Sequence, residues 1–137
     1  MGTLVTDAQP LLAVLLDEPS AAEVRRLLRK HFARGGVVIS AVNWCEVIYT
    51  SRNRSDAFTT ARVQSLLQRV PVSVVAVGPE LAAHAAEMKV THRLGLGDCF
   101  AAALAIMTDS PLLTGDADFL PLAEHGLKIE WVGEERP

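Results

Sequence analysis

Two aspartates follow a short apolar stretch near the end of the chain, where a buried strand is expected to end. The segment LLTGDADFL, residues 112–120, places Asp116 and Asp118 just beyond Thr114. Aspartate is a poor strand residue and is almost never fully buried without a partner. These carboxylates therefore mark a place where the chain either turns or binds a cation.

Three further acids stand at comparable positions. Asp7 directly follows the apolar stretch LVT, Asp98 follows Gly-Leu-Gly in front of an alanine-rich segment, and Glu46 lies inside the apolar run VNWCEVIY. Each has a structural alternative. Asp7 and Asp98 are good helix caps, Asp116 is a good turn residue, and Glu46 is compatible with a half-exposed helix position. Taken singly, none of them identifies a function.

Taken together, Asp7, Glu46, Asp98 and Asp116 indicate a metal site. Carboxylates that converge repel one another and raise one another's pKa unless a cation neutralises them. A pattern of oxygen ligands without cysteine or histidine suits Mg²⁺ or Mn²⁺ better than zinc. Such an ion activates a bound water and stabilises charge on a phosphoryl oxygen. The chemistry that this predicts is hydrolysis of a phosphodiester.

The elements that must position these acids alternate between strands and helices. Short apolar segments predict strands at 4–6, 37–40, 72–77, 111–114 and 127–132. The segment at 72–77 is β-branched and uninterrupted, which predicts a buried strand. Helices are predicted between them: one opened by Pro10, one after the capping box of Ser20 and Glu23, one from about Val42, one capped by Ser55 or Asp56, one starting at Pro79, and the alanine-rich one at Asp98.

This alternation predicts a parallel sheet covered by helices on both faces, which is an α/β sandwich. The 137 residues suit a single domain spanning 1–137. In such a sheet, ligands bind beyond the carboxyl ends of the strands. Asp7 and Asp116 therefore share one crevice if their strands are neighbours.

Charge is segregated along the chain. Residues 1–23 hold four acids and no Lys or Arg, residues 24–93 hold eleven Lys and Arg against four acids, and residues 94–137 hold eight acids against two basic residues. Basic side chains around an acidic metal pocket suit a nucleic acid, whose phosphates they bind. Solvated helix faces are the alternative explanation.

The two cysteines, Cys45 and Cys99, lack the spacing of a zinc site or a disulfide framework, and a reducing cytoplasm is the expected location. No apolar run approaches the roughly 18 residues of a membrane span, and the N-terminal stretch does not have the pattern of a secretory signal. We expect no membrane association.

The motifs also resemble a known family. T-D-A near the start, I-S-A-V-N-W-C-E-V, L-G-L-G-D-C-F-A-A-A-L-A and L-L-T-G-D-A-D-F are similar in order to the PIN domain, and within it to VapC-type toxins of toxin–antitoxin pairs. The resemblance implies a three-layer α/β/α sandwich with a five-stranded parallel sheet. It also implies an endoribonuclease that uses Mg²⁺ or Mn²⁺ and leaves a 5′-phosphate and a 3′-hydroxyl.

Roles are also implied by the resemblance. Asp7, Asp98 and Asp116 would hold the metal, and Glu46 would orient or deprotonate the attacking water. Asp118 matches a more variable acid and is treated as auxiliary. Auxiliary roles are also expected for Asn43 and Thr114, as polar supports, and for Gln9, which stands where the family often has Ser or Thr and offers its amide to the same site.

Partners follow from the same resemblance. They are an RNA substrate, with structured RNA such as tRNA as the expected class, a VapB-type antitoxin and a second copy of the chain in a homodimer. The early helical segments 11–19 and 27–32 would line a groove for the antitoxin. Candidate RNA-binding residues are Arg25, Arg26, Arg29, Arg52 and Arg54.

Two other functions are alternatives to the nuclease. A non-catalytic PIN-like RNA-binding or scaffold domain would be expected to lose one or more of the four acids, and all four are present. A phosphoacceptor receiver domain needs an adjacent acid pair after its first strand and an aspartate after its third. Here Asp7 stands alone and Val77-Gly78-Pro79 follow the third predicted strand.

Overall fold

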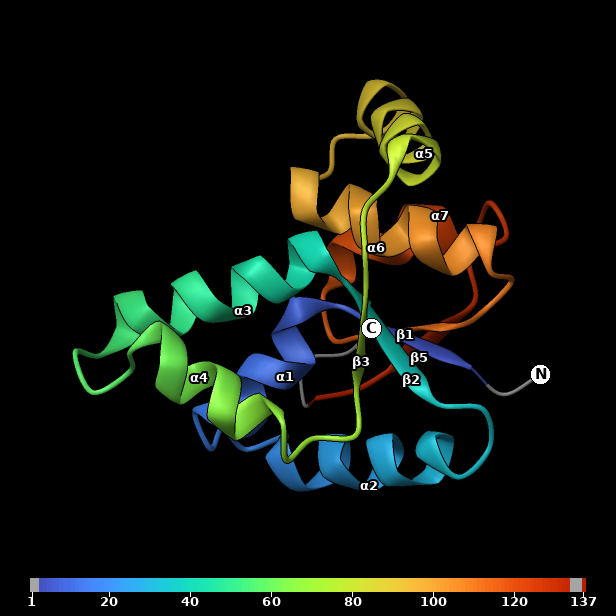
Figure 1. Ribbon diagram of the computed structural model, residues 1–137. Helices are drawn as coiled ribbons and strands as arrows, with labels where there is room; N and C mark the ends of the chain where they lie inside the picture. Colours follow the sequence, from blue (N-terminus) through green and yellow to red (C-terminus); the bar gives the residue numbers. More distant parts are fainter. Residues whose placement is uncertain (1–2, 134–136) are drawn as a thin grey trace.

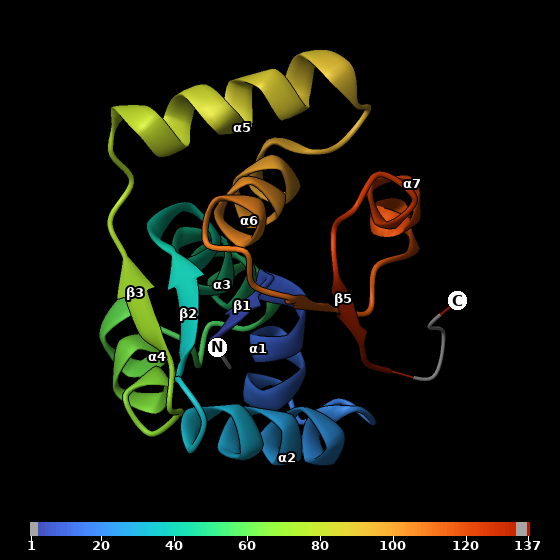
Figure 2. The same cartoon turned by 90° about the vertical axis from the view of Figure 1, so that its right-hand side faces the viewer.

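The computed structural model describes residues 3–133 and 137 and has helices on both faces of one sheet (Figures 1 and 2). In chain order the elements are β1 (Leu4–Thr6), α1 (Ala8–Leu15), α2 (Ala21–Phe32), β2 (Val37–Ser40), α3 (Ala41–Arg54), α4 (Thr60–Leu67), β3 (Ser73–Val75), α5 (Pro79–Thr91), α6 (Leu96–Met107), β4 (Leu112–Thr114), the 3₁₀ helix η1 (Ala117–Phe119), α7 (Leu120–Ala123) and β5 (Ile129–Trp131).

The sheet has five parallel strands, as predicted, and their order is β3-β2-β1-β4-β5. The chain moves outward from β1 to β2 and β3, then crosses back through α5 and α6 to place β4 on the other side of β1. The strand order therefore reverses between β1 and β4, where Val5 pairs with Leu112 and Thr6 with Leu113. A crevice for ligands is expected beyond the carboxyl ends of these two strands.

Each face of the sheet has its own apolar core. Alternate residues of a strand point to opposite faces, so Leu4 joins the core under α1, α2 and α4, whereas Val5 joins the core under α5, α6 and α7. Leu113 and Leu112 divide in the same way. The alanines of α6 are fully buried, which lets this helix lie close on the sheet (Figure 2).

Several element predictions were wrong in detail. β3 was expected to be buried, but it is an edge strand and Val74 is 44% exposed. α1 begins at Ala8 with Asp7 as its cap, before Pro10. α4 is capped by Thr59 and not by Ser55 or Asp56, because the α3–α4 connection is longer than expected.

The predicted capping box at α2 does not form either. Ser20 lies in a helical backbone conformation, and its side chain does not cap the helix. Glu23 instead accepts a hydrogen bond from the backbone N–H of Gly133, at 2.9 Å. A contact from the end of the chain has therefore replaced the local one.

Within residues 3–133, no single helix is long and apolar enough to span a membrane; the pair α5 and α6, bent by 119°, passes that test only when taken together, on length and composition.

Candidate active site

Asp7 stands where β1 and β4 end side by side. Its backbone N–H donates to the carbonyl of Leu113 at 3.1 Å, which continues the β1–β4 ladder. One side-chain oxygen accepts from the Ala8 N–H at 2.8 Å and so caps α1, while the other accepts from the Thr114 hydroxyl at 3.0 Å. The carboxylate is 4% exposed. Both strands and α1 therefore fix its position.

The turn after β4 carries Asp116 and Asp118. The Asp116 N–H donates to the Thr114 hydroxyl at 3.1 Å, and the Asp118 N–H donates to Oδ1 of Asp116 at 2.9 Å. The Gly115 N–H donates to Oε1 of Gln9 at 3.1 Å. Gln9 thus holds the backbone of the turn through its side-chain oxygen. Thr114 links the acids of the two strands.

Glu46 and Asp98 are brought together where α3 meets the start of α6. The buried Asn43 amide donates to Oε1 of Glu46 at 2.8 Å and to the carbonyl of Gly97 at 2.9 Å. Its own oxygen accepts from the Ser40 hydroxyl at 2.6 Å. Asn43 is therefore a bridge that orients Glu46 against the residue preceding Asp98.

Gly97 is required for this approach. A Cβ added at Gly97 would overlap the Glu46 carboxylate. Sequence reasoning noted the glycines of 95–97 without finding this contact, because nothing local indicates that α3 passes there. Ser40 was also missed, although a serine three residues before Asn43 is a usual helix-capping pattern and caps α3 here.

Three carboxylates form a cluster. Oxygens of Asp98, Asp116 and Asp118 all lie within 4.8 Å of one another. Asp118, predicted only as auxiliary, is thus one of this trio, together with two of the three predicted metal ligands. The third predicted ligand, Asp7, is linked to the cluster electrostatically. Burial and then the charge of Asp98 raise the pKa of Asp7 to about 7, and Glu46 adds a smaller rise. The hydrogen bonds that Asp7 accepts from Ala8 and Thr114 lower this pKa but do not offset the rise.

The pKa of Asp98 is also raised, to about 6. Burial is the largest cause, followed by the charges of Asp116, Glu46 and Asp118. Clustered carboxylates with raised pKa values are characteristic of functional sites. An all-oxygen donor set of this kind fits Mg²⁺ or Mn²⁺. The five acids singled out in the sequence therefore lie at one edge of the sheet, in an arrangement suited to a hard divalent cation.

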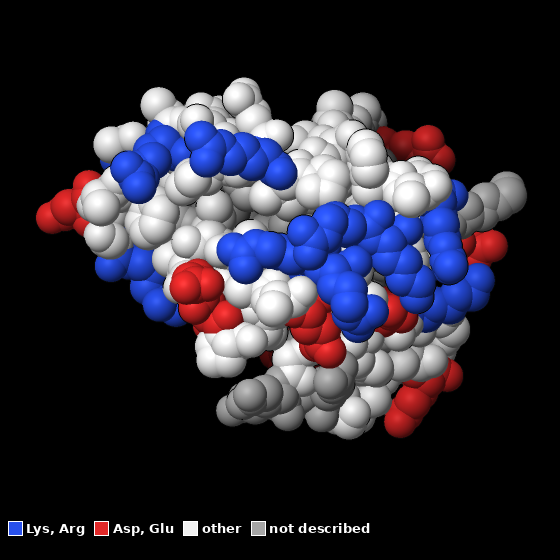
Figure 3. All heavy atoms as spheres, turned by 90° about the horizontal axis from the view of Figure 1, so that it is seen from below, with Lys and Arg blue, Asp and Glu red and all other residues white. Residues whose placement is uncertain are grey.

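The predicted RNA-binding arginines lie on α2 and at the end of α3. Arg25, Arg26 and Arg29 are exposed on α2, the helix at the bottom of Figure 1, and Figure 3 shows basic side chains gathered on that side of the molecule. Arg52 and Arg54 are exposed in the last turn of α3, where Arg52 donates to the Thr60 hydroxyl at 3.2 Å. They occupy two separate helices.

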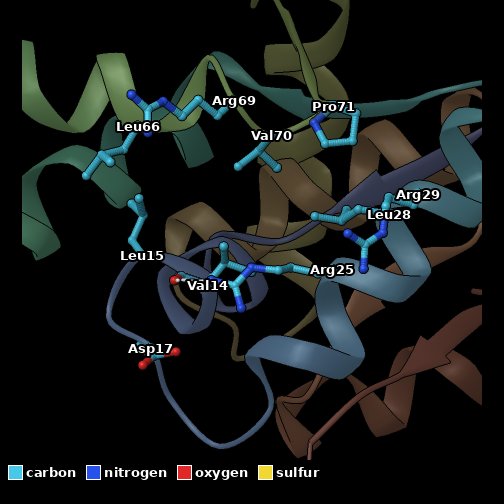
Figure 4. A pocket seen from close by; sticks show the side chains of 10 residues that line it. All are labelled: Val14, Leu15, Asp17, Arg25, Leu28, Arg29, Leu66, Arg69, Val70 and Pro71. Carbon is cyan, nitrogen blue, oxygen red and sulfur yellow. Dashed lines mark hydrogen bonds between the residues drawn. The ribbon is translucent and has the colours of Figure 1, made fainter.

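A pocket of about 440 Å³ lies between the end of α1, α2 and the end of α4. Figure 4 shows the arginines of α2, Arg25 and Arg29, on one side and Arg69 on another, around apolar side chains that include Val14 and Val70. Arg25 donates to the carbonyl of Val14 at 3.5 Å. The segments predicted to line a groove, 11–19 and 27–32, both contribute to this pocket.

Comparison with solved structures shows the fold of this chain in several toxin–antitoxin proteins. VapBC2 of Rickettsia felis, bound to a DNA fragment from its promoter, is 15% identical over 96% of this chain and 99% of that chain, with a TM-score of 0.76. DNA-bound VapBC of Salmonella typhimurium is 17% identical, covering 95% and 98%, with a TM-score of 0.73. VapC20 of Mycobacterium tuberculosis, a sarcin–ricin loop cleaving toxin, is 18% identical, covering 98% and 99%, with a TM-score of 0.70.

At these identities the likeness shows the fold alone. No curated protein matches the sequence. The model of the PIN domain family matches residues 4–124, a span that includes every acid of the site. The chain therefore belongs to the PIN-domain family.

Proposed function

We propose that this chain is a metal-dependent endoribonuclease and the toxin of a VapBC-type toxin–antitoxin pair, acting in the cytoplasm. The observation that carries the proposal is the tight carboxylate cluster of Asp98, Asp116 and Asp118. After burial, the charge of Asp98 is the next cause that raises the pKa of Asp7. After burial and Asp116, the charge of Glu46 raises the pKa of Asp98. The structural similarity to three toxin–antitoxin proteins supports the toxin assignment.

In this proposal Asp7, Asp98 and Asp116 hold Mg²⁺ or Mn²⁺, and Asp118 contributes a further oxygen at the same cluster. When bound, such an ion lowers the pKa of a coordinated water and stabilises charge on the scissile phosphate. Thr114 keeps Asp7 oriented, because its hydroxyl donates to the carboxylate oxygen that does not cap α1.

Glu46 is the proposed general base. Asn43 fixes its Oε1 by a hydrogen bond, which leaves Oε2 to accept a proton from the attacking water. In-line attack by that water would form a new bond to phosphorus and break the bond to the 3′ oxygen, which takes a proton from solvent. The products would be a 5′-phosphate and a 3′-hydroxyl. Gln9 supports the reaction indirectly by holding the turn that carries Asp116.

The pocket between α1, α2 and α4 is the proposed site for the antitoxin. Its apolar lining suits an amphipathic segment of a partner, and its arginines suit acidic side chains on that segment. A homodimer and an RNA substrate complete the proposed set of partners. Arg52 and Arg54 on α3, together with the arginines of α2, are proposed to bind RNA phosphates.

The test is cleavage of total cellular RNA by the purified, antitoxin-free protein in Mn²⁺, Mg²⁺ or EDTA, with Asp98→Asn alongside. Asp98→Asn keeps the side-chain shape but removes a charge, so we expect discrete metal-dependent fragments from the wild type and none from the variant. Circular dichroism checks that the variant is folded. Full cleavage by folded Asp98→Asn would refute the assignment of the site.

The second candidate is a non-catalytic PIN-like RNA-binding domain. It shares the basic surface of α2 (Figure 3) but needs no metal. Binding of RNA that is unchanged by EDTA, combined with no cleavage under any metal, would favour this candidate over the nuclease.

A further inference from the structure

A second pocket, of about 330 Å³, opens beside the carboxylate cluster. One wall is formed by His92, Arg93 and Leu94 from the α5–α6 connection, and the other by Asp118, Pro121 and Leu122 from η1 and α7. Asp118 therefore belongs both to this pocket and to the cluster with Asp98 and Asp116. The pocket and the cluster are therefore neighbours that share one side chain.

The wall that carries His92 and Arg93 is firmly held. The Leu94 side chain is 5% exposed and belongs to the core under α6. The Leu94 carbonyl accepts from Nζ of Lys89 at 2.6 Å, and the His92 N–H donates to the Met88 carbonyl at 2.8 Å. These contacts fix the connection, so the pocket is preformed.

The ring of His92 also lies near a histidine ring outside the pocket lining. Its centroid lies 6.2 Å from that of His125, which follows α7, and the two rings are tilted by 48°. The imidazole is half-buried, while the Arg93 side chain is exposed. The pocket thus offers a flat ring, a guanidinium and apolar surface from Leu94, Pro121 and Leu122.

These three features match one nucleotide of a single strand. Aromatic and histidine rings stack on unpaired bases, and arginine binds phosphate through charge-assisted hydrogen bonds. The volume lies within the range of small-ligand pockets. Because Asp118 bridges the pocket and the cluster, a strand with its scissile phosphate at the cluster can place an adjacent nucleotide in the pocket.

We propose that this pocket is the subsite for the nucleotide next to the cleaved phosphodiester, with Arg93 binding a phosphate of the strand and His92 stacking on the base. The proposal rests on the proposed nuclease function and names part of its substrate site. It predicts that the bound RNA is unpaired at this position, even where the rest of the substrate is structured.

The first experiment measures cleavage kinetics on an oligoribonucleotide that spans a site mapped in total cellular RNA. We expect Arg93→Gln to raise KM about tenfold, with kcat within about twofold, because the lost contact lies outside the reacting atoms. Arg34→Gln is the matched control. It removes the same charge just before β2, at the opposite end of the strands from the carboxylate cluster.

His92 is tested with two variants that separate stacking from a structural role. His92→Ala removes the ring and is expected to raise KM about tenfold, in line with the loss of one stacked base. His92→Phe restores a stacking ring without the imidazole nitrogens and is expected to recover most of the wild-type KM. Equal impairment in both variants would overturn the stacking assignment.

A second experiment reads the pocket without catalysis. The wild type, Arg93→Gln, His92→Ala and Arg34→Gln are titrated in EDTA against a fluorescein-labelled single-stranded RNA dodecamer of random sequence, and anisotropy gives Kd. We expect the two pocket variants to bind about tenfold more weakly than Arg34→Gln.

The outcomes separate this inference from the nuclease proposal. Wild-type cleavage with pocket variants that behave like Arg34→Gln in both experiments overturns the subsite and leaves the nuclease standing. If the wild type cleaves no RNA, the nuclease proposal fails and the binding experiment alone decides. Weaker binding by the pocket variants then supports binding of single-stranded RNA in this pocket but not its place beside a cleaved phosphodiester, and unchanged binding overturns both.

Discussion

At the scale of single residues, the acids of this site have structural roles that are compatible with the proposed chemical ones. Asp7 caps α1 with one oxygen and receives the Thr114 hydroxyl with the other. Asp116 shapes its turn by accepting from the Asp118 N–H while it lies in the carboxylate cluster. In the sequence, each acid can be interpreted either as a helix cap or turn residue or as a metal ligand. The two interpretations are compatible, because a carboxylate has about four lone-pair sites.

Asn43→Asp tests the bridge between α3 and α6. The substitution preserves shape but places a carboxylate oxygen against the Glu46 carboxylate and the Gly97 carbonyl, where an amide now donates to both. We expect a loss of about 2 kcal/mol in the free energy of unfolding and at least a tenfold loss in kcat, because Glu46 is displaced. Urea denaturation and cleavage kinetics measure the two effects.

The matched control for this prediction is Asn53→Asp, on the exposed face of the same helix. It adds the same charge to α3 without changing the bridge, and we expect stability within about 0.5 kcal/mol of the wild type. Asn43→Asp and Asn53→Asp with the same kcat would show that the bridge does not orient Glu46.

Gln9 is a residue whose place in the site could be predicted from the sequence but whose hydrogen-bond partner could not. Its position two residues after Asp7 predicted an amide offered to the same site as the acids, and its Oε1 accepts from the Gly115 N–H, in the turn that carries Asp116. The direction of a long side chain on a helix depends on the neighbours that fold over it, and the turn after β4 is 106 residues away. The residue was identified, and its contact was not.

At the scale of elements, the site depends on how closely α3 approaches the first turn of α6. Gly97→Ala places a methyl group where the Glu46 carboxylate now lies. The obstacle is the end of a side chain, so we expect the fold to persist and Glu46 to move. A displacement of about 1 Å can reduce a rate about a hundredfold. We therefore expect kcat to fall between tenfold and a hundredfold, measured by single-turnover cleavage.

Gly95→Ala is the control for that prediction. Its added Cβ would meet only an oxygen of Asp98, at 3.9 Å, which is ordinary van der Waals contact. The backbone φ of −61° at Gly95 suits alanine. We expect cleavage close to that of the wild type; equal losses in Gly95→Ala and Gly97→Ala would indicate a general loss of flexibility before α6.

Most elements and the positions of the acids on them were predictable, because apolar runs report burial on both faces of a parallel sheet. The order of the strands was not predictable in the same way. Residues 72–77 are as apolar as any other run, yet β3 lies at an edge with Val74 exposed. The contact of Glu23 with Gly133 was equally hidden, since it joins distant parts of the chain.

At the scale of the whole molecule, the charge segregation seen in the sequence becomes a spatial one. Basic residues of α2 face outward (Figure 3), whereas Asp98, Asp116 and Asp118 of the site lie within 4.8 Å of one another. Burial first, and then the repulsion between neighbouring acids, raises the pKa of Asp7 to about 7 and that of Asp98 to about 6. Without a cation the site therefore opposes folding at neutral pH.

This opposition predicts a pH dependence with a defined sign. Between about pH 4 and pH 7 the folded chain holds more protons on Asp7 and Asp98 than the unfolded chain does, because both pKa values are raised from 3.8. Stability decreases with pH wherever the folded state binds more protons. The contribution of these two groups is therefore fully present below about pH 4 and is lost as the pH rises through 6 and 7.

Asp98→Asn removes one of the two groups, so its stability relative to the wild type is expected to grow from pH 4 to pH 7 in EDTA. Solvent screens the half-buried carboxylate, so we expect a gain on the order of 1 kcal/mol at pH 7. Urea denaturation followed by circular dichroism measures it, with the exposed Asp56→Asn as control.

Added Mn²⁺ at 100 times its Kd should stabilise the wild type by about 2.7 kcal/mol and Asp98→Asn by much less. The opposite result is a difference in the free energy of unfolding between Asp98→Asn and wild type that stays constant from pH 4 to pH 7. It would show that the carboxylates do not interact as the structure indicates. The electrostatic argument for a cation at this edge of the sheet would then be lost.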